Sequence, residues 1–178
     1  MSNCLAWRIQ LFLMSLPFLG ACSVSSSYTG DGRLIDNGSS AANERYVVEL
    51  GQLDLGRAGS TTFRLGGLPA VSFVAGVQVP AGSDPGGTRT LEGTTADVSL
   101  ELMDASGNRV FSVAGPLRDW VWSSPMRGGP SFVYRRPPSG SFFVASLGST
   151  YKLQATVRAP DPTIPAGTLV VLKSGGWK

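Results

Sequence analysis

Apolar and polar residues alternate along most of the chain after residue 45, with the two-residue period of a β-strand. The clearest examples are residues 71–79, 98–102 and 151–158, in each of which every second residue is apolar. Shorter candidates occur over residues 120–122, 132–134 and 142–144, and further strands are expected over residues 46–50, 61–65, 109–113 and 168–172. The last of these segments is apolar on both faces, so we expect it at the centre of a sheet.

Turn-forming residues separate these segments, and no stretch after residue 22 has the i, i+3, i+4 pattern of an amphipathic helix. The chain contains 23 glycines and 12 prolines. Residues 104–108 read Asp-Ala-Ser-Gly-Asn between two alternating segments, which is typical of a hairpin loop. Eight or nine short strands predict an all-β fold, an antiparallel β-sandwich of the Ig-like or jelly-roll type. A small β-barrel is the alternative.

The first 22 residues depart from this pattern. Arg8 is their only basic side chain, residues 9–19 are almost entirely apolar, and Gly20, Ala21 and Cys22 follow. A basic start, an apolar run of about ten residues and a small-residue exit are the parts of a secretory signal peptide. The run is shorter than the roughly 20 apolar residues that a membrane-spanning helix needs.

The sequence Leu19-Gly20-Ala21-Cys22 resembles the lipobox of bacterial lipoproteins: an aliphatic residue, two small residues and a cysteine. The resemblance implies cleavage between Ala21 and Cys22, with a diacylglyceryl group on the Cys22 sulfur and acylation of the new amine. Ser23 stands where an inner-membrane lipoprotein commonly has aspartate, so the resemblance favours the outer membrane, facing the periplasm. An ordinary signal peptide with an incidental cysteine is the alternative.

Three regions follow from these patterns: a signal peptide over 1–21, a lipidated cysteine with a flexible Ser/Gly-rich tether over 22–43, and a sandwich domain over 44–178. A flexible chain of about 20 residues has an end-to-end distance of roughly 25 Å. Leu34 and Ile35 are the only apolar pair within the tether and could dock on the domain. Because Cys4 leaves with the signal and Cys22 carries lipid, the mature domain has neither a free thiol nor a disulfide.

The missing residue types exclude several classes of chemistry. The chain has no histidine, which removes Ser-His-Asp and Cys-His nucleophile systems and nearly every zinc, copper or haem site. No phosphate-binding loop or dinucleotide fingerprint occurs. The net charge of +3 is too small to indicate a nucleic-acid partner. We therefore expect no cofactor and no metal.

Two further kinds of chemistry, glycoside hydrolysis by a carboxylate pair and calcium binding, are weakly supported by the sequence. A pair drawn from Glu49, Glu92 and Glu101 could hydrolyse a glycoside, but Glu49 and Glu101 occupy outward strand positions typical of a solvated face. Oxygen ligands for calcium occur in two short sets that lack the dense acidic spacing of known calcium loops. These sets are Asp31, Asp36 and Asn37, and Asp104, Ser106 and Asn108. The second set is interpreted as a hairpin turn.

Arginine and aromatic residues gather in one region, as in the energetic centres of protein–protein interfaces. The candidate binding surface comprises Arg118, Trp120, Trp122, Arg127, Tyr134, Arg135 and Arg136. Trp120 and Trp122 are two residues apart on one expected strand, so their side chains share a face. That face is either an exposed aromatic platform or part of the sandwich core, as for the buried tryptophan of Ig-like folds.

Together these features predict a membrane-anchored lipoprotein on the periplasmic side, without enzymatic activity, whose domain binds a protein. An envelope assembly or secretion subunit and a toxin-immunity or inhibitor lipoprotein both fit this description. Binding of carbohydrate or peptidoglycan through Trp120 and Trp122 is the alternative from another class, followed by a carboxylate-based glycosidase.

Overall fold

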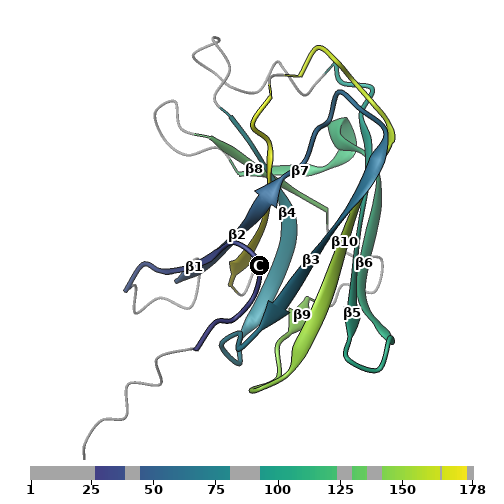
Figure 1. Ribbon diagram of the computed structural model, residues 1–178. Helices are drawn as coiled ribbons and strands as arrows, with labels where there is room; N and C mark the ends of the chain where they lie inside the picture. Colours follow the sequence, from purple (N-terminus) through teal and green to yellow (C-terminus); the bar gives the residue numbers. More distant parts are fainter. Residues whose placement is uncertain are drawn as a thin grey trace, which may run out of the picture.

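The computed structural model describes residues 27–38, 45–80, 93–123, 130–135, 142–164 and 166–175. These residues form two antiparallel β-sheets packed against each other, which confirms the predicted all-β sandwich (Figure 1). Within these ranges no helix has the length and hydropathy needed to cross a membrane. Ala21 and Cys22 lie outside the described residues.

The larger sheet, called sheet A, has the strand order β1-β2-β11-β4-β8-β7, and β9 also pairs with β4. Its strands are β1 (Arg33–Asp36), β2 (Tyr46–Gln52), β4 (Ser72–Val79), β7 (Val121–Ser123), β8 (Ser131–Tyr134), β9 (Phe143–Val144) and β11 (Leu169–Ser174). β11 lies between β2 and β4, so the prediction of a central strand is confirmed.

The smaller sheet, called sheet B, has the order β3-β10-β5-β6. Its strands are β3 (Gly59–Gly66), β10 (Thr150–Ala159), β5 (Asp97–Asp104) and β6 (Arg109–Pro116). One 3₁₀ turn, η1 (Leu117–Asp119), follows β6. The expected hairpin over residues 104–108 is confirmed: the Asp104 N–H donates to the Asn108 carbonyl at 2.9 Å, and Gly107 has φ of 83°.

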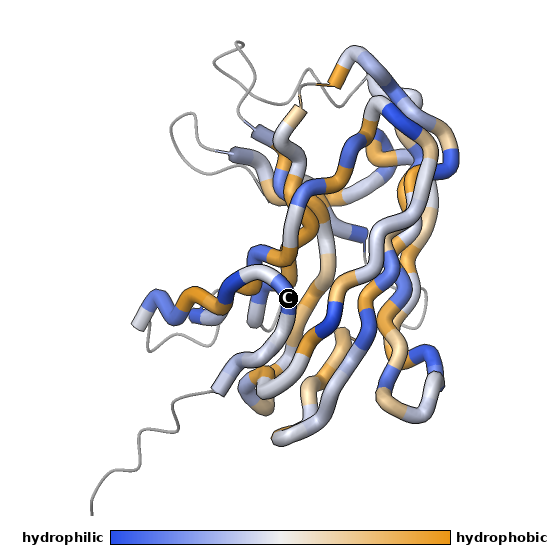
Figure 2. Tube along the Cα trace, viewed as in Figure 1, coloured by the Kyte–Doolittle hydropathy of each residue, from blue (hydrophilic) through white to orange (hydrophobic). Residues whose placement is uncertain are grey.

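The core lies between the sheets and follows the alternation seen in the sequence, which Figure 2 shows as changing hydropathy along the strands. In β10, Leu153 and Ala155 point into the core and are fully buried. Lys152, which precedes Leu153, points the other way and is exposed. Sheet A is apolar on its outer face as well. Val74, Phe132, Tyr134 and Val171 form a second buried cluster there.

The segment 27–36 corrects the prediction of a flexible tether over the whole of 22–43. The Thr29 N–H donates to the Gly66 carbonyl at 3.0 Å, and the Asp31 N–H donates to the Arg64 carbonyl at 2.7 Å, so this segment runs along the edge of β3. It then crosses to sheet A, where β1 pairs with β2. Residues 27–36, called the strap, thus join the two sheets along one open edge, and docking of Leu34 is confirmed by its packing against the core.

Close backbone contacts explain why glycines occur in and beneath the strap. Gly32 has φ of 76°, a left-handed conformation that other residues rarely adopt, and a Cβ atom there would collide with the Glu49 carbonyl oxygen. Gly67 has φ of 65°, and a Cβ atom there would collide with the carbonyl oxygen of Ser27. The chain therefore reaches the domain surface at Ser27, only five residues after Cys22.

Candidate functional site

Three turns gather with the start of the strap at one end of the sandwich, called the lower end (Figure 1). They are residues 67–71, 105–108 and 145–149. The strand registers place them together: Thr150, which follows the third turn, pairs with Gly66 before the first turn, and Tyr151 pairs with Asp104 before the second.

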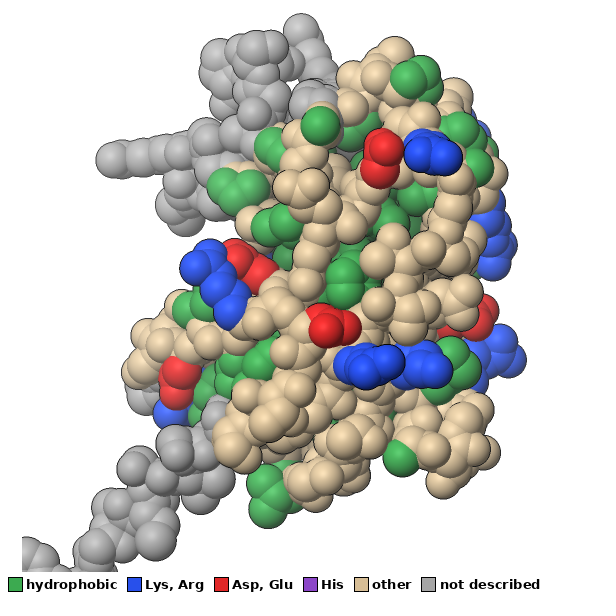
Figure 3. Space-filling model, viewed as in Figure 1, with side chains coloured by type: hydrophobic (Ala, Val, Ile, Leu, Met, Phe, Trp, Pro, Cys, Tyr) green, Lys and Arg blue, Asp and Glu red, His purple; other side chains and the backbone are tan. Residues whose placement is uncertain are grey.

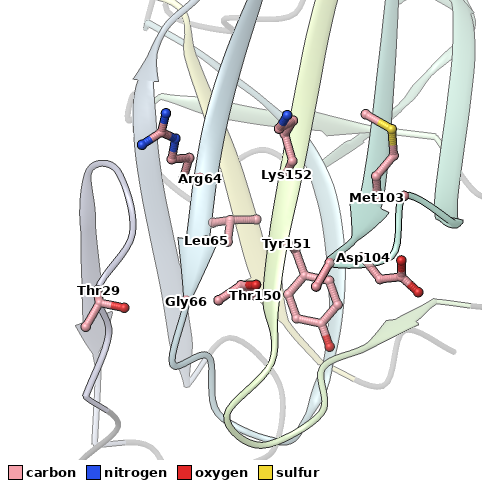
Figure 4. A pocket seen from close by; sticks show the side chains of 11 residues that line it. Thr29, Arg64, Leu65, Gly66, Met103, Asp104, Thr150, Tyr151 and Lys152 are labelled. Atoms are coloured by element: carbon pink, nitrogen blue, oxygen red, sulfur yellow. The ribbon is translucent and has the colours of Figure 1, made fainter.

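A hollow of about 430 Å³ opens near this end, on the outer face of sheet B. Strands β3, β10 and β5 form its floor, and the β5–β6 hairpin and the strap form its sides (Figure 4). The residues that line it are Thr29, Arg64, Leu65, Gly66, Met103, Asp104, Ala105, Gly107, Thr150, Tyr151 and Lys152.

Two cations stand side by side in this hollow. Lys152 lies directly opposite Arg64 on one neighbouring strand and opposite Met103 on the other. Both basic side chains are exposed, and neither forms an ion pair with any residue in the described ranges. Like charges directly opposite on adjacent strands repel each other, so this pair lowers stability unless an anion lies beside it. Figure 3 shows basic side chains adjacent to one another on this face.

The carboxylate that lines the hollow is already occupied by the hairpin. Asp104 accepts hydrogen bonds from the Ser106 N–H at 2.9 Å, the Asn108 N–H at 2.8 Å and the Asn108 side-chain amide at 3.1 Å. The side-chain bond from Asn108, followed by its backbone bond, lowers the pKa of Asp104. This carboxylate therefore serves the turn, as the hairpin interpretation of Asp104, Ser106 and Asn108 predicted, and leaves the two cations for a ligand.

A second hollow of about 600 Å³ lies on the other side of the same hairpin and shares Asp104, Ala105, Thr150 and Tyr151 with the first. The Tyr151 hydroxyl oxygen accepts a hydrogen bond from the Ser146 N–H at 2.9 Å. Its ring meets Phe143 edge-on at 4.7 Å. Val110 and Val144 border this hollow and are 41% and 62% exposed, so its rim is apolar.

The carboxylates considered for glycoside hydrolysis do not form a pair. Glu49 is on β2 of sheet A and pairs with Arg33 at 2.7 Å, whereas Glu101 is on β5 of sheet B and lies 3.8 Å from Arg109. Glu92 lies outside the described residues. No group of three or more potential metal ligands occurs in the described part of the chain.

The other calcium set is also engaged in structural contacts. The Asp31 carboxylate accepts the Arg64 N–H at 2.7 Å, and Asp36 forms two 3.1 Å hydrogen bonds with Arg45. The Arg45 side chain is the main cause of the lowered pKa of Asp36. Both carboxylates therefore hold the strap in place.

The aromatic residues of the sequence-predicted surface are buried where the structure describes them. Trp120 is 3% exposed, follows η1 rather than standing within a strand, and packs in the main core. Its indole N–H donates to the Gly115 carbonyl at 3.2 Å. Tyr134 is 5% exposed in the second cluster and stacks on Phe132 at 5.6 Å. Of the two interpretations weighed for Trp120, core or platform, the core is correct.

The arginines of that surface do not form one patch. Arg118 lies in η1, exposed, 3.9 Å from Asp119. Arg135 is partly buried and donates to the Ala114 carbonyl at 2.7 Å, so it links sheet A to the edge of β6. Trp122 belongs to β7 but its side chain lies outside the described part, as do Arg127 and Arg136 altogether.

One buried carboxylate was not anticipated from the sequence. Asp161 is 5% exposed and accepts hydrogen bonds from the Thr94 hydroxyl, the Thr95 N–H, and both the hydroxyl and N–H of Thr163, at 2.6–3.0 Å. These bonds, led by that of the Thr163 hydroxyl, lower the pKa of Asp161 to about 2. The carboxylate joins two loops at the end opposite the hollow, so its role is structural.

The cation pair was missed because its two members are far apart in the sequence. Each residue is recognisable as an outward position of an alternating strand, but only the pairing of β3 with β10 brings Arg64 beside Lys152. No protein-family model, curated protein or solved structure matches this chain. Its function must therefore be argued from its own residues.

Proposed function

We propose that this protein is a lipoprotein of the bacterial envelope, anchored through Cys22 in the outer membrane facing the periplasm, whose sandwich domain binds an acidic segment of another protein. The anchor is proposed from the match of Leu19-Gly20-Ala21-Cys22 to the lipobox. One acyl chain holds a protein only marginally at a membrane, but two or three on one cysteine make the attachment durable.

The observation that carries the partner proposal is the placement of Arg64 opposite Lys152, without an ion pair from either to the part of the chain that the structure describes. A carboxylate held between two cations forms charge-assisted hydrogen bonds, which are stronger than neutral ones. Binding would also remove the repulsion between the two side chains. Thr29 and Thr150 offer hydroxyl groups at the edge of the same hollow, and Met103 offers an adaptable apolar contact.

Binding is favoured over glycoside hydrolysis because Glu49 and Glu101 lie on different sheets, each beside an arginine, and do not form a pair. It is favoured over sugar stacking on Trp120 because that ring is buried in the core. A surface that combines a cation pair, hydroxyls and a thioether is suited to a peptide segment bearing Asp or Glu.

The anchor is tested with Cys22→Ser in the full-length precursor. We expect the intact mass of the mature wild-type protein to include the acyl groups, and the variant to move from the membrane fraction to the soluble fraction. A wild-type mass without acyl groups, or a variant that sediments with membranes as before, would refute the anchor.

The partner site is tested by placing a photoreactive amino acid at position 154, next to the cation pair along β10, in living cells. We expect a discrete protein adduct that disappears in the double variant Arg64→Gln/Lys152→Gln. The matched control is Arg57→Gln/Arg118→Gln, which removes the same charge from exposed positions elsewhere. Equal loss of the adduct in both double variants would mean that net charge, and not this site, is responsible.

A further inference from the structure

The two ends of the sandwich differ in charge. The three turns of the lower end read Gly-Leu-Pro-Ala-Val, Ala-Ser-Gly-Asn and Ala-Ser-Leu-Gly-Ser, over residues 67–71, 105–108 and 145–149. Charge adjoins them only at the second turn, which is flanked by Asp104, whose carboxylate is bonded to the turn, and by Arg109. At the other end, the described connections carry the exposed residues Asp54, Arg57, Arg118 and Asp119. Charged residues are expected in solvent-facing turns, so an end with few of them is suited to a less polar environment.

Exposed apolar side chains occur at this lower end. Leu147, in the turn before β10, is 74% exposed, and Val144 in β9 is 62% exposed. Val110, which follows the β5–β6 hairpin, is 41% exposed. The lower part of Figure 3 accordingly shows hydrophobic and neutral surface. Removal of leucine and valine side chains from water is favourable, so these residues would stabilise contact with an apolar layer.

The chain itself leads from this end to the proposed anchor. Ser27 lies against Gly67 in the first of the three turns. Cys22 precedes Ser27 by five residues, and five residues span at most about 17 Å at full extension. An acylated cysteine lies at the level of the lipid headgroups. The lower end therefore cannot stand far from the bilayer, whereas the opposite end is separated from it by the length of the strands.

We propose that the lower end of the sandwich rests on the lipid bilayer, with Leu147 and Val144 inserted among the headgroups. This inference rests on the anchor proposed above. The contact orients the domain with its strands pointing away from the membrane. It also brings the hollow that holds Arg64 and Lys152 close to the bilayer, on the side of the domain.

The test uses the lipidated full-length protein in vesicles of phosphatidylethanolamine with a minor fraction of phosphatidylglycerol. Single variants Leu147→Cys and Val144→Cys receive an environment-sensitive fluorophore, with Arg57→Cys at the opposite end as the matched control. Intact mass first establishes acylation of each sample. We expect blue-shifted emission and strong quenching by spin-labelled lipid at positions 144 and 147, and aqueous emission at position 57.

Each alternative outcome is decisive. An acylated protein whose labels at 144 and 147 remain in water overturns the inference and leaves the anchor intact. A mature protein without acyl groups overturns the anchor and the inference with it. Labels that are protected in native envelope membranes but not in pure lipid vesicles would assign this end to a protein contact, which also overturns the inference.

Discussion

At the scale of single residues, the positions that tolerate least change are those where the backbone leaves no room. Gly32 combines a left-handed backbone with direct contact to the Glu49 carbonyl, and Gly30 is enclosed by the Tyr28 ring and the Arg64 carbonyl. Burial raises the pKa of Tyr28, with a smaller contribution from the nearby Asp31. Residues 28–32, Tyr-Thr-Gly-Asp-Gly, have the composition of a linker but are closely packed against β3 and β2.

Replacement of Gly32 by alanine should detach the strap from β2. A left-handed backbone costs roughly 1–2 kcal/mol for a residue with a Cβ, and the collision with Glu49 adds to this. We expect a lower free energy of unfolding in urea and faster proteolysis within 27–36. Gly59→Ala is the control, because Gly59 has open space around it and no positive φ. Equal stability of the two variants would contradict this account of the strap.

Replacement of Asp161 by asparagine should change the response to acid. Hydrogen bonds hold its pKa at about 2 in the folded state, below the value of about 3.9 in unfolded chains. Its stabilising contribution is therefore complete above about pH 5 and disappears as the pH falls towards 2. Asp161→Asn should lose about 1–3 kcal/mol at neutral pH and show a smaller further loss in acid.

Urea unfolding of the wild type and Asp161→Asn across this pH range measures the effect. Asp119→Asn, at an exposed position, is the control and should follow the wild type. Parallel pH curves for the wild type and Asp161→Asn would show that the carboxylate makes no pH-dependent contribution.

At the scale of elements, the two open edges of the sandwich are closed by different means. The strap covers the edge of β3 and continues into β1 beside β2. On the other side, Arg135 and Trp120 donate to the carbonyls of Ala114 and Gly115 on β6. Unpaired strand edges promote aggregation, so both devices limit edge-to-edge pairing of the domain.

The Asp31 carboxylate fixes the strap to β3 by accepting a hydrogen bond from the Arg64 N–H at 2.7 Å. Because this hydrogen bond is exposed, Asp31→Ala should lower stability by only about 0.5–1.5 kcal/mol, and it should increase amide exchange at Arg64. Asp31→Asn retains an oxygen acceptor and should lose less. The idea fails if hydrogen–deuterium exchange at Arg64 is the same in the wild type and Asp31→Ala.

The strands were predictable because alternation is a local pattern, and nearly every segment inferred from it is a strand. β1 was missed because Leu34 and Ile35 are surrounded by residues typical of linkers, and only pairing with β2 makes them a strand. The sequence did not decide between the core and an exposed platform for Trp120, because an apolar strand face is compatible with both. The cation pair could not be predicted because it depends on the register between β3 and β10, which are distant in the sequence. Local sequence patterns do not specify that register.

At the scale of the whole molecule, the distribution of charge and the proposed anchor together define a direction. The lower end with Leu147 is the end from which the chain runs towards Cys22, and the connections at the far end carry the charged residues. The domain thus has more charged residues in its connections at one end, and its exposed Leu147, Val144 and Val110 at the other. A short connection strengthens such a contact because it keeps the local concentration of the tethered surface high.

Insertion of a long Gly/Ser segment between Cys22 and Ser27 should weaken this contact without affecting acylation. We expect the fluorophore at position 147 to lose part of its blue shift and quenching, in proportion to the inserted length. An insertion of equal length after Arg57, in an exposed turn at the opposite end, controls for general disturbance of the fold. If the label responds equally to both insertions, the length of the tether does not determine the contact.

The central place of β11 in sheet A has a consequence for how the protein reaches its native state. Its neighbours β2 and β4 are synthesised long before it. They are connected within the sheet only when Leu169–Ser174 pairs with both of them. Contacts between such distant segments form slowly, because a large loop must close first. Synthesis can therefore be nearly complete while the larger sheet is still open. A chain interrupted before β11 would carry two unsatisfied strand edges and should be prone to degradation.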